Sequence, residues 1–236
     1  MSTEVMEIRG IRKQFGGVRA LDSVDLELDI SQPTALIGPN GSGKTTLFNI
    51  ISGFLRADEG TIRWTDQRVD GLDPRRMVRL GVTRTFQQRM LFDRATVAEN
   101  IAVAGLAAGL TGAELARRVD AGVEAFGLTA WAGRLSASVP FGVARRVAVA
   151  AATMSSPRLL LLDEPAAGLS DEECLQLDST LRGLIDRGIG IFLVDHNMDF
   201  ISPLCERMVV LANGKLIADG DRNVLKSPEV ISAYLD

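Results

Sequence analysis

The sequence has few cysteines and no long apolar segment, and each lack excludes a class of protein. Two cysteines, Cys174 and Cys205, are too few for a disulfide framework or a cysteine metal site, so we expect reduced thiols. The longest weakly polar stretch, residues 101–113, is well short of the roughly 20 residues that span a bilayer. The N-terminus contains Glu4 and Glu7 and no apolar signal segment. We therefore expect a soluble protein that reaches a membrane only through a partner.

The chain also lacks an excess of basic residues. Its 26 Lys and Arg face 30 Asp and Glu, for a formal net charge of −4. A nucleic-acid binder needs a basic surface to neutralise phosphates, so we expect no nucleic-acid partner. A hydrophobic content of 46% and a charged content of 24% exclude a disordered chain. The 236 residues have room for one large domain or two modest ones.

Apolar patterning predicts an α/β fold. Residues 24–30 alternate between apolar and acidic side chains, as in a half-buried strand. Residues 158–162 and 191–194 are almost wholly apolar, as in parallel strands buried on both faces. Further strands are expected at 34–37, 60–64, 82–86, 208–211 and 215–218, the last two joined by the turn Asn213-Gly214. Helices are expected at 44–51, capped by Gly53, at 114–126 and at 171–187, and residues 96–153 have the composition of an inserted helical subdomain.

A glycine-rich segment fits the phosphate-binding loop pattern, GxxxxGK followed by Ser or Thr. It follows a predicted strand and opens a predicted helix, which is the context that confirms the pattern. Its glycines let backbone N–H groups turn toward phosphate oxygens, Lys44 reaches the β- and γ-phosphates, and the Thr45 hydroxyl is a Mg²⁺ ligand. The expected nucleotide contacts are Gly38, Pro39, Asn40, Gly41, Ser42, Gly43, Lys44, Thr45 and Thr46.

Two carboxylates follow the apolar strand at residues 159–162. Asp163 and Glu164 emerge at its carboxyl end, where open α/β sheets bind ligands. Beside a phosphate-binding loop, Asp163 is expected to hold Mg²⁺ through water and Glu164 to polarise the attacking water. The combination predicts an NTPase.

The ordered set of motifs resembles the ATP-binding subunits of ABC transporters over residues 8–235. Within that family it is most similar to the LivG-type ATPases of branched-chain amino acid transporters. The local cues are Phe15-Gly16-Gly17-Val18, Thr85-Phe86-Gln87, the segment 163–169 and the ending Pro228-Glu229-Val230 with Ala233-Tyr234-Leu235. The resemblance implies a single ABC ATPase domain over 1–236. Its fold is a P-loop NTPase (RecA-like) core with an antiparallel β edge, formed by 1–90 and 157–236. The inserted helical subdomain spans 91–156.

The resemblance also implies roles for three further side chains. Phe15 falls where the family stacks an aromatic ring on adenine. Gln87 matches the glutamine that contacts Mg²⁺ and senses the permease; the adjacent Gln88 leaves a one-residue alternative, and Gln87 is preferred because it follows Thr85-Phe86. His196, the chain's only histidine, matches the family's switch histidine, which contacts the γ-phosphate and orients the water.

The family's signature motif, usually Leu-Ser-Gly-Gly-Gln at a helix start, is altered here. The matching stretch is Val139-Pro140-Phe141-Gly142-Val143, which we call the signature stretch. Pro140 replaces the serine and so removes a hydroxyl and an N–H, and Val143 replaces the glutamine. Gly142 and the helix N-terminus remain to attract an anion. A competing register at Leu135-Ser136 is rejected because it puts Ser138 and Val139 where glycines belong.

The resemblance implies the ATP-binding and hydrolysing subunit of an importer for branched-chain amino acids or related small polar solutes. ATP and Mg²⁺ are the expected cofactors. The expected partners are a second ABC ATPase subunit (in a homo- or heterodimer), two membrane permease subunits and, indirectly, a secreted solute-binding protein. The expected location is peripheral, at the cytoplasmic face of the inner membrane. The alternatives are a non-transport ABC-type ATPase and a weakly hydrolysing regulatory partner of a heterodimer.

Overall fold

A six-stranded, mainly parallel sheet forms the centre of the molecule in the computed structural model, which describes residues 4–85 and 91–235. Its strand order is β10-β9-β3-β8-β7-β6, and only β10 is antiparallel to its neighbour. The strands are β3 (Thr34–Ile37), β6 (Val82–Arg84), β7 (Leu159–Asp163), β8 (Gly190–Val194), β9 (Arg207–Ala212) and β10 (Lys215–Gly220). Because Leu36 and Asp163 both pair with Val194, the loops that follow β3, β7 and β8 begin side by side.

Both faces of this sheet are buried, which explains the continuous apolar runs of its strands. Leu160 and Leu162 of β7 pack into one hydrophobic cluster, whereas Leu159 and Leu161 pack into another on the opposite face. In β3, Ala35 and Ile37 likewise pack into the first of these clusters and Leu36 into the second. A strand with apolar residues at every position is therefore the expected result of a sheet covered on two sides.

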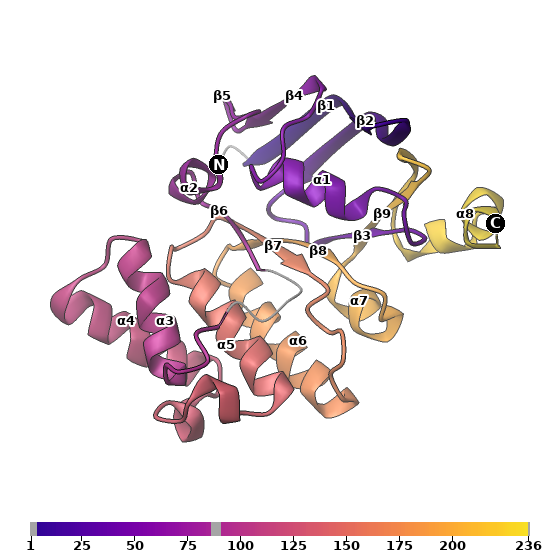
Figure 1. Ribbon diagram of the computed structural model, residues 1–236. Helices are drawn as coiled ribbons and strands as arrows, with labels where there is room; N and C mark the ends of the chain where they lie inside the picture. Colours follow the sequence, from indigo (N-terminus) through magenta and orange to yellow (C-terminus); the bar gives the residue numbers. More distant parts are fainter. Residues whose placement is uncertain (1–3, 86–90, 236) are drawn as a thin grey trace.

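A second, antiparallel sheet covers one face, with helix α1 (Lys44–Ile51) packed between the two sheets (Figure 1). Its strand order is β2-β1-β4-β5. The strands are β1 (Val5–Phe15), β2 (Val18–Asp29), β4 (Glu59–Trp64) and β5 (Gln67–Arg68). Buried Leu47, Phe48 and Ile51 of α1 share one cluster with residues of both sheets. This packing places the start of α1, and with it the phosphate-binding loop, at the carboxyl ends of the parallel strands.

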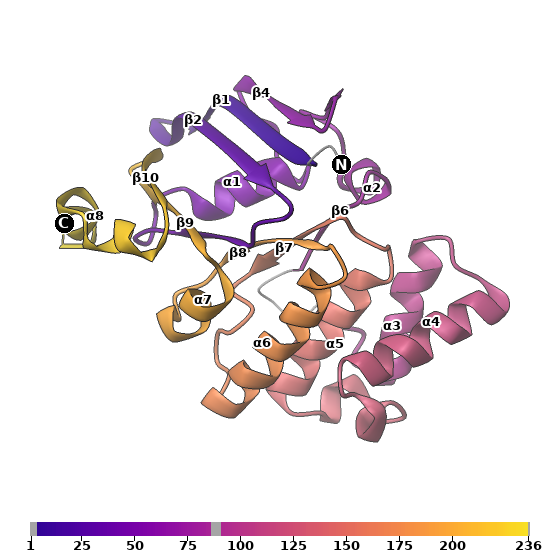
Figure 2. The ribbon, with the colours of Figure 1, turned by 180° about the vertical axis from the view of Figure 1, so that it is seen from behind.

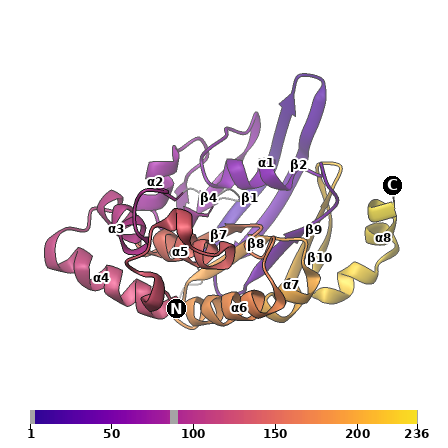
Figure 3. The same ribbon diagram turned by 60° about the horizontal axis from the view of Figure 1, so that its bottom comes forward.

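Helices cover the other face of the central sheet (Figure 2). Figure 3 shows α3 and α4 at one end of the molecule and α8 at the other. The helices that join the cluster on this face are α3 (Val97–Ala107), α4 (Gly112–Ala125), α5 (Phe141–Thr153), α6 (Asp171–Ile185), α7 (Met198–Leu204) and α8 (Pro228–Leu235). Helix α2 (Pro74–Arg79) instead packs through Met77 into the cluster that contains α1. Short 3₁₀ turns are η1 (Thr129–Trp131), η2 (Ser136–Ser138) and η3 (Arg222–Lys226).

Residues 91–156, all of which the structure describes, form helices and turns with one isolated bridge between Thr96 and Leu135. Helix α3 begins with a reciprocal capping box, in which Thr96 and Glu99 satisfy each other's backbone N–H groups. Apolar residues of α3, α4 and α5 join the cluster beneath the central sheet, so these helices share their core with it.

The predicted α/β architecture is confirmed: a mainly parallel core with an antiparallel β part and inserted helices. The antiparallel part is larger than an edge, because β1, β2, β4 and β5 form a sheet of their own. Cys174 and Cys205 are buried and free, and burial raises the pKa of Cys205 to about 12. Within the described ranges, no helix has both the length and the apolarity to cross a bilayer.

Candidate active site

The phosphate-binding loop joins β3 to α1 and is packed tightly enough that two of its glycines cannot be replaced. Gly38 has a φ of +150°, and a Cβ there would lie 2.0 Å from the Leu211 carbonyl oxygen of β9. Gly43 has a φ of +108°, and its Cβ would lie 2.4 Å from the Ala20 carbonyl oxygen of β2. The glycines at these two positions are therefore required by both conformation and space.

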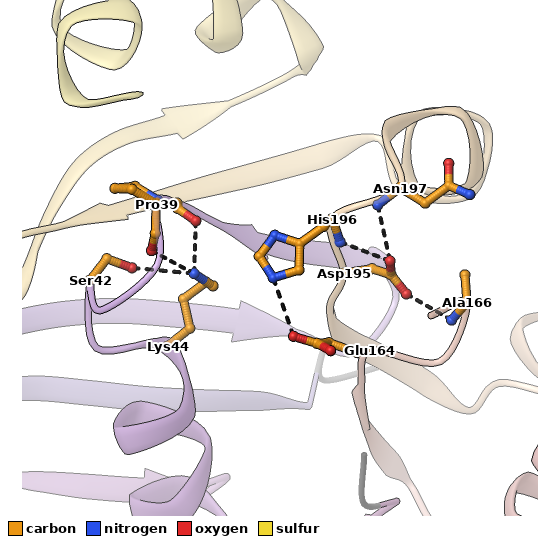
Figure 4. A network of polar contacts seen from close by, with 9 residues as sticks. Pro39, Ser42, Lys44, Glu164, Ala166, Asp195, His196 and Asn197 are labelled. Atoms are coloured by element: carbon orange, nitrogen blue, oxygen red, sulfur yellow. Dashed lines mark hydrogen bonds and ion pairs between the residues drawn. The ribbon is translucent and has the colours of Figure 1, made fainter. Parts of the chain in front are cut away.

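Lys44 folds back over this loop (Figure 4). Its ammonium donates hydrogen bonds to the carbonyl oxygens of Gly38, at 2.7 Å, and Pro39, at 2.8 Å, and lies 3.5 Å from the Ser42 hydroxyl. Burial lowers the pKa of Lys44, whereas the nearby negative charge of Glu164 raises it. The ammonium is therefore held inside the loop, where phosphate oxygens can take over its hydrogen bonds.

The loop is braced by the hairpin turn between β9 and β10. The Gly214 N–H donates to the Ser42 carbonyl at 3.0 Å, and the Asp22 N–H donates to the Gly214 carbonyl at 2.8 Å. The turn Asn213-Gly214, predicted from the sequence, thus links the phosphate-binding loop to β2.

The two acids lie as expected at the carboxyl end of β7, with Asp163 as its last residue and Glu164 directly after it. The Asp163 side chain is 10% exposed and accepts a hydrogen bond from the Arg84 guanidinium at 2.7 Å. Glu164 has a φ of +47°, a backbone conformation that is costly outside glycine and that concentrates at functional sites. Its N–H donates to the Val194 carbonyl at 2.7 Å, which ties the loop after β7 to the end of β8.

His196 and Glu164 meet across two neighbouring loops (Figure 4). The His196 Nε2 lies 3.2 Å from the Glu164 Oε1, and the histidine side chain is 51% exposed. The buried Asp195 carboxylate accepts hydrogen bonds from the N–H groups of Ala166, at 2.7 Å, His196, at 2.7 Å, and Asn197, at 3.0 Å. Asp195 therefore fixes the loop that presents His196 against the loop that follows Glu164.

The remaining predicted residues are the aromatic ring proposed for adenine, the rest of the phosphate-binding loop and the predicted glutamine. Phe15 ends β1 with 48% of its surface exposed, and the Lys13 ammonium lies 5.5 Å from its ring centroid. Its pairing partner Val18 lies two residues before Ala20, the residue that touches the phosphate-binding loop. Asn40, Gly41 and Thr45 are exposed, and Thr46 is half-buried. Gln87, with its alternative Gln88, lies outside the described residues.

The signature stretch starts helix α5. Pro140 is the N-cap, and its carbonyl accepts the Ala144 N–H at 3.0 Å. Gly142 lies against the Glu173 side chain of α6, because a Cβ on it would be 2.1 Å from the Glu173 Oε1. By contrast, the rejected Ser136 lies in η2, where its hydroxyl accepts a hydrogen bond from Asn100 at 2.7 Å.

Sequence reasoning missed two residues of this site, Arg84 and Asp195. The sequence does carry a local signal for Asp195, because it is an acid immediately after a buried strand. No motif in the neighbouring sequence identifies Arg84 as a site residue, because its partners Asn49 and Asp163 are distant in sequence.

Comparison with known proteins agrees with this geometry. A family model described as ABC transporter matches residues 21–167. The chain is 36% identical to the high-affinity branched-chain amino acid transport ATP-binding protein LivG of Escherichia coli (strain K12), over 100% of this chain and 99% of that protein. It is 34% identical to the corresponding protein BraF of Pseudomonas aeruginosa, with the same coverage.

Solved structures show the same fold at full length. MJ1267, an ATP-binding cassette of an ABC transporter, superposes with a TM-score of 0.93 at 28% identity and covers 100% of both chains. The ADP conformation of that cassette gives a TM-score of 0.90 over 99% of both chains. By family model, full-length similarity and fold, this chain belongs to the ABC transporter family, as an ATP-binding subunit that hydrolyses ATP to drive transport.

Proposed function

We propose that this chain hydrolyses Mg²⁺-ATP to power the import of branched-chain amino acids or related small polar solutes. The observation that carries the proposal is that Lys44, Glu164 and His196 follow three neighbouring parallel strands and face one region (Figure 4). Phosphoryl transfer to water needs positioned groups for the phosphates and for the water. The similarity to LivG and BraF, whose names specify branched-chain amino acid transport, supports the solute class.

In the proposed reaction, a water oxygen attacks the γ-phosphorus as the bond to the β–γ bridging oxygen breaks, releasing ADP and phosphate. Glu164 accepts a hydrogen bond from the water and takes its proton as the new bond forms. Lys44 exchanges its bonds to the Gly38 and Pro39 carbonyls for bonds to phosphate oxygens. His196, held 3.2 Å from Glu164, contacts the γ-phosphate and orients the water.

The oxygen donors of the site fit Mg²⁺, which prefers carboxylate, hydroxyl and water ligands. We assign the Thr45 hydroxyl and, through water, the Asp163 carboxylate to the metal. When bound, Mg²⁺ neutralises charge on the β- and γ-phosphates. We keep Gln87 as the third expected metal contact and as the link to the permease.

The other residues predicted from the sequence are proposed to complete the nucleotide site. Phe15, half exposed at the end of β1, is proposed to stack on adenine. The backbone N–H groups of residues 38 and 40–46 are proposed to surround the phosphates, and Pro39, which has no N–H, to shape the loop between them. Gly142 and the start of α5 are proposed to face the ATP of a second ATPase subunit, so that each ATP lies between two chains.

We propose that the division into a core of 1–90 and 157–236 and a helical subdomain of 91–156 has a mechanical role. ATP binding closes the dimer, hydrolysis reopens it, and the helices pass this motion to two permease subunits at the cytoplasmic face of the inner membrane. A secreted binding protein delivers the solute on the other side.

The altered signature stretch favours a heterodimer in which this chain contributes the weaker signature, so that the site formed by its Lys44 and the partner's intact signature is the faster one. Pro140 at the N-cap of α5 supplies neither the hydroxyl nor the N–H that serine would offer to a γ-phosphate. A hydrogen bond to a charged group contributes about 1.5–3 kcal/mol, or roughly tenfold to a hundredfold in closed-dimer population. We therefore expect feeble ATPase activity from the purified chain alone, and faster turnover with a second ATPase subunit whose signature is intact.

Changing Pro140→Ser and Val143→Gln together should raise steady-state phosphate release by the lone chain about tenfold or more. The matched control is Pro140→Ala with Val143→Ala, which restores the N–H but neither the hydroxyl nor the amide, and should give a smaller increase. A brisk rate before the change, or no increase after it, would show that the signature stretch is misassigned.

The proposed function as a whole is tested on a complex assembled with permease, second ATPase and binding-protein subunits from the same organism. ATP hydrolysis in proteoliposomes should be stimulated by binding protein loaded with leucine, isoleucine or valine. Stimulation by urea, amides or aromatic acids instead would change the solute, and failure to associate with any permease would favour a non-transport ATPase.

A further inference from the structure

Arg84 at the end of β6 joins the two elements that bear the proposed Mg²⁺ ligands. Its guanidinium donates to the Asp163 Oδ2 at 2.7 Å, and both side chains are nearly buried, at 4% and 10% exposure. On its other side it donates to the Asn49 Oδ1 of α1 at 2.6 Å and to the Oγ of Ser52, the C-cap residue of α1, at 3.2 Å.

The helical spacing of these contacts relates them to Thr45. Residues three or four apart lie on one face of a helix, so Thr45, Asn49 and Ser52 share a face of α1. The guanidinium also lies 5.7 Å from the ring centroid of buried Phe48, on the same face. Arg84 therefore contacts α1 one turn and two turns beyond Thr45 while it holds the carboxylate of Asp163.

A guanidinium suits this bridging position. It is planar and always charged, and its fixed fork of N–H groups can bind a carboxylate and an amide oxygen at once. A nearly buried carboxylate needs such a partner, because an unpaired charge in this environment is strongly disfavoured.

We propose that Arg84 is a positioning residue for the metal: it fixes the Asp163 carboxylate and α1 at the separation that receives Mg²⁺ bound to the nucleotide. This inference rests on the proposed Mg²⁺ roles of Thr45 and Asp163. Outer partners that orient metal-binding side chains generally contribute tenfold to a hundredfold in metal affinity.

The test measures how strongly Mg²⁺ improves binding of a non-hydrolysable ATP analogue, by calorimetry with Mg²⁺ and in its absence. In Arg84→Ala we expect the improvement to fall by about tenfold to a hundredfold. Binding of the metal-free analogue should be unchanged, because the phosphate-binding loop supplies it. Arg84→Lys, which keeps the charge but loses the fork, should recover part of the effect.

A control variant distinguishes a positioning role of Arg84 from a contribution to the stability of the fold alone. Arg207 makes a two-bond ion pair with Asp219, at 2.7 Å for each bond, near the opposite edge of the central sheet. Arg207→Ala should lower thermal stability without changing the Mg²⁺ effect. If Arg84→Ala behaves in the same way, the proposal is wrong.

Two further variants keep the result interpretable. Asp163→Asn should also lose the Mg²⁺ effect, and an unchanged Mg²⁺ effect in this variant would overturn the proposed role of Asp163. If Asp163→Asn loses the Mg²⁺ effect but Arg84→Ala retains it, only the proposed role of Arg84 is overturned. If Arg84→Ala does not fold, Asn49→Ala removes one anchor on α1 while keeping the ion pair. It should still weaken the Mg²⁺ effect, and an unchanged effect there would overturn the proposal.

Discussion

Replacing Lys44 by alanine should weaken ATP binding by about a hundredfold or more. The ammonium is available to phosphates because it is held inside the loop by bonds to the Gly38 and Pro39 carbonyls. Each charge-assisted bond to a phosphate oxygen contributes about 1.5–3 kcal/mol, and at least two are lost together. Calorimetric titration of the purified chain with ATP measures the effect.

Lys226→Ala is the matched control, since Lys226 is exposed on η3, and it should bind ATP as wild type does. Lys44→Arg keeps the charge with a wider head group and should bind more weakly than wild type. Undiminished affinity in Lys44→Ala would show that the loop between β3 and α1 is not the nucleotide site.

Replacing Glu164 by glutamine should lower hydrolysis by about a hundredfold or more while leaving ATP binding intact. A positioned general base contributes roughly 10²–10⁴-fold in rate, and glutamine keeps the size of the side chain but cannot take a proton. The variant should also accumulate an ATP-bound dimer, because the closed state is no longer released by hydrolysis. Given Pro140 in the signature stretch, this dimer should form readily only with the second ATPase subunit present.

Phosphate release and gel filtration measure both effects on the two-subunit assembly. Glu172→Gln is the matched control, because Glu172 is an exposed acid in the first turn of α6. It should hydrolyse ATP normally. Activity near wild type in Glu164→Gln would remove Glu164 from the mechanism.

The strands and loops of the site could be predicted from the sequence where the signal is local. Strand β3 and helix α1 have the bounds predicted from the sequence, 34–37 and 44–51. Strand β7 lies at 159–163, one residue later than the predicted strand at 158–162. The signals for these elements, apolar periodicity and the glycine pattern, each lie within a short stretch of neighbouring residues. The Asn213-Gly214 hairpin was predicted for the same reason.

Features that depend on distant contacts could not be predicted. The alternation of apolar and acidic residues predicts β2. Strand β1 lacks such an alternation, because Arg9, Gly10 and Arg12 lie where its register with β2 is interrupted. The requirement for glycine at Gly38 comes from the Leu211 carbonyl of β9. Likewise, the Arg84–Asp163 pair joins residues 79 apart in sequence, so only the parallel pairing of β6 and β7 reveals it.

Uptake of radiolabelled leucine by cells that lack this gene tests the central claim most directly. Deletion should abolish leucine uptake, and the wild-type chain should restore it. Glu164→Gln and Lys44→Ala should not restore it, although both proteins are present at normal levels. Unchanged uptake of leucine, isoleucine and valine after deletion, or full restoration by Glu164→Gln, would contradict the claim that ATP hydrolysis at this site powers their import.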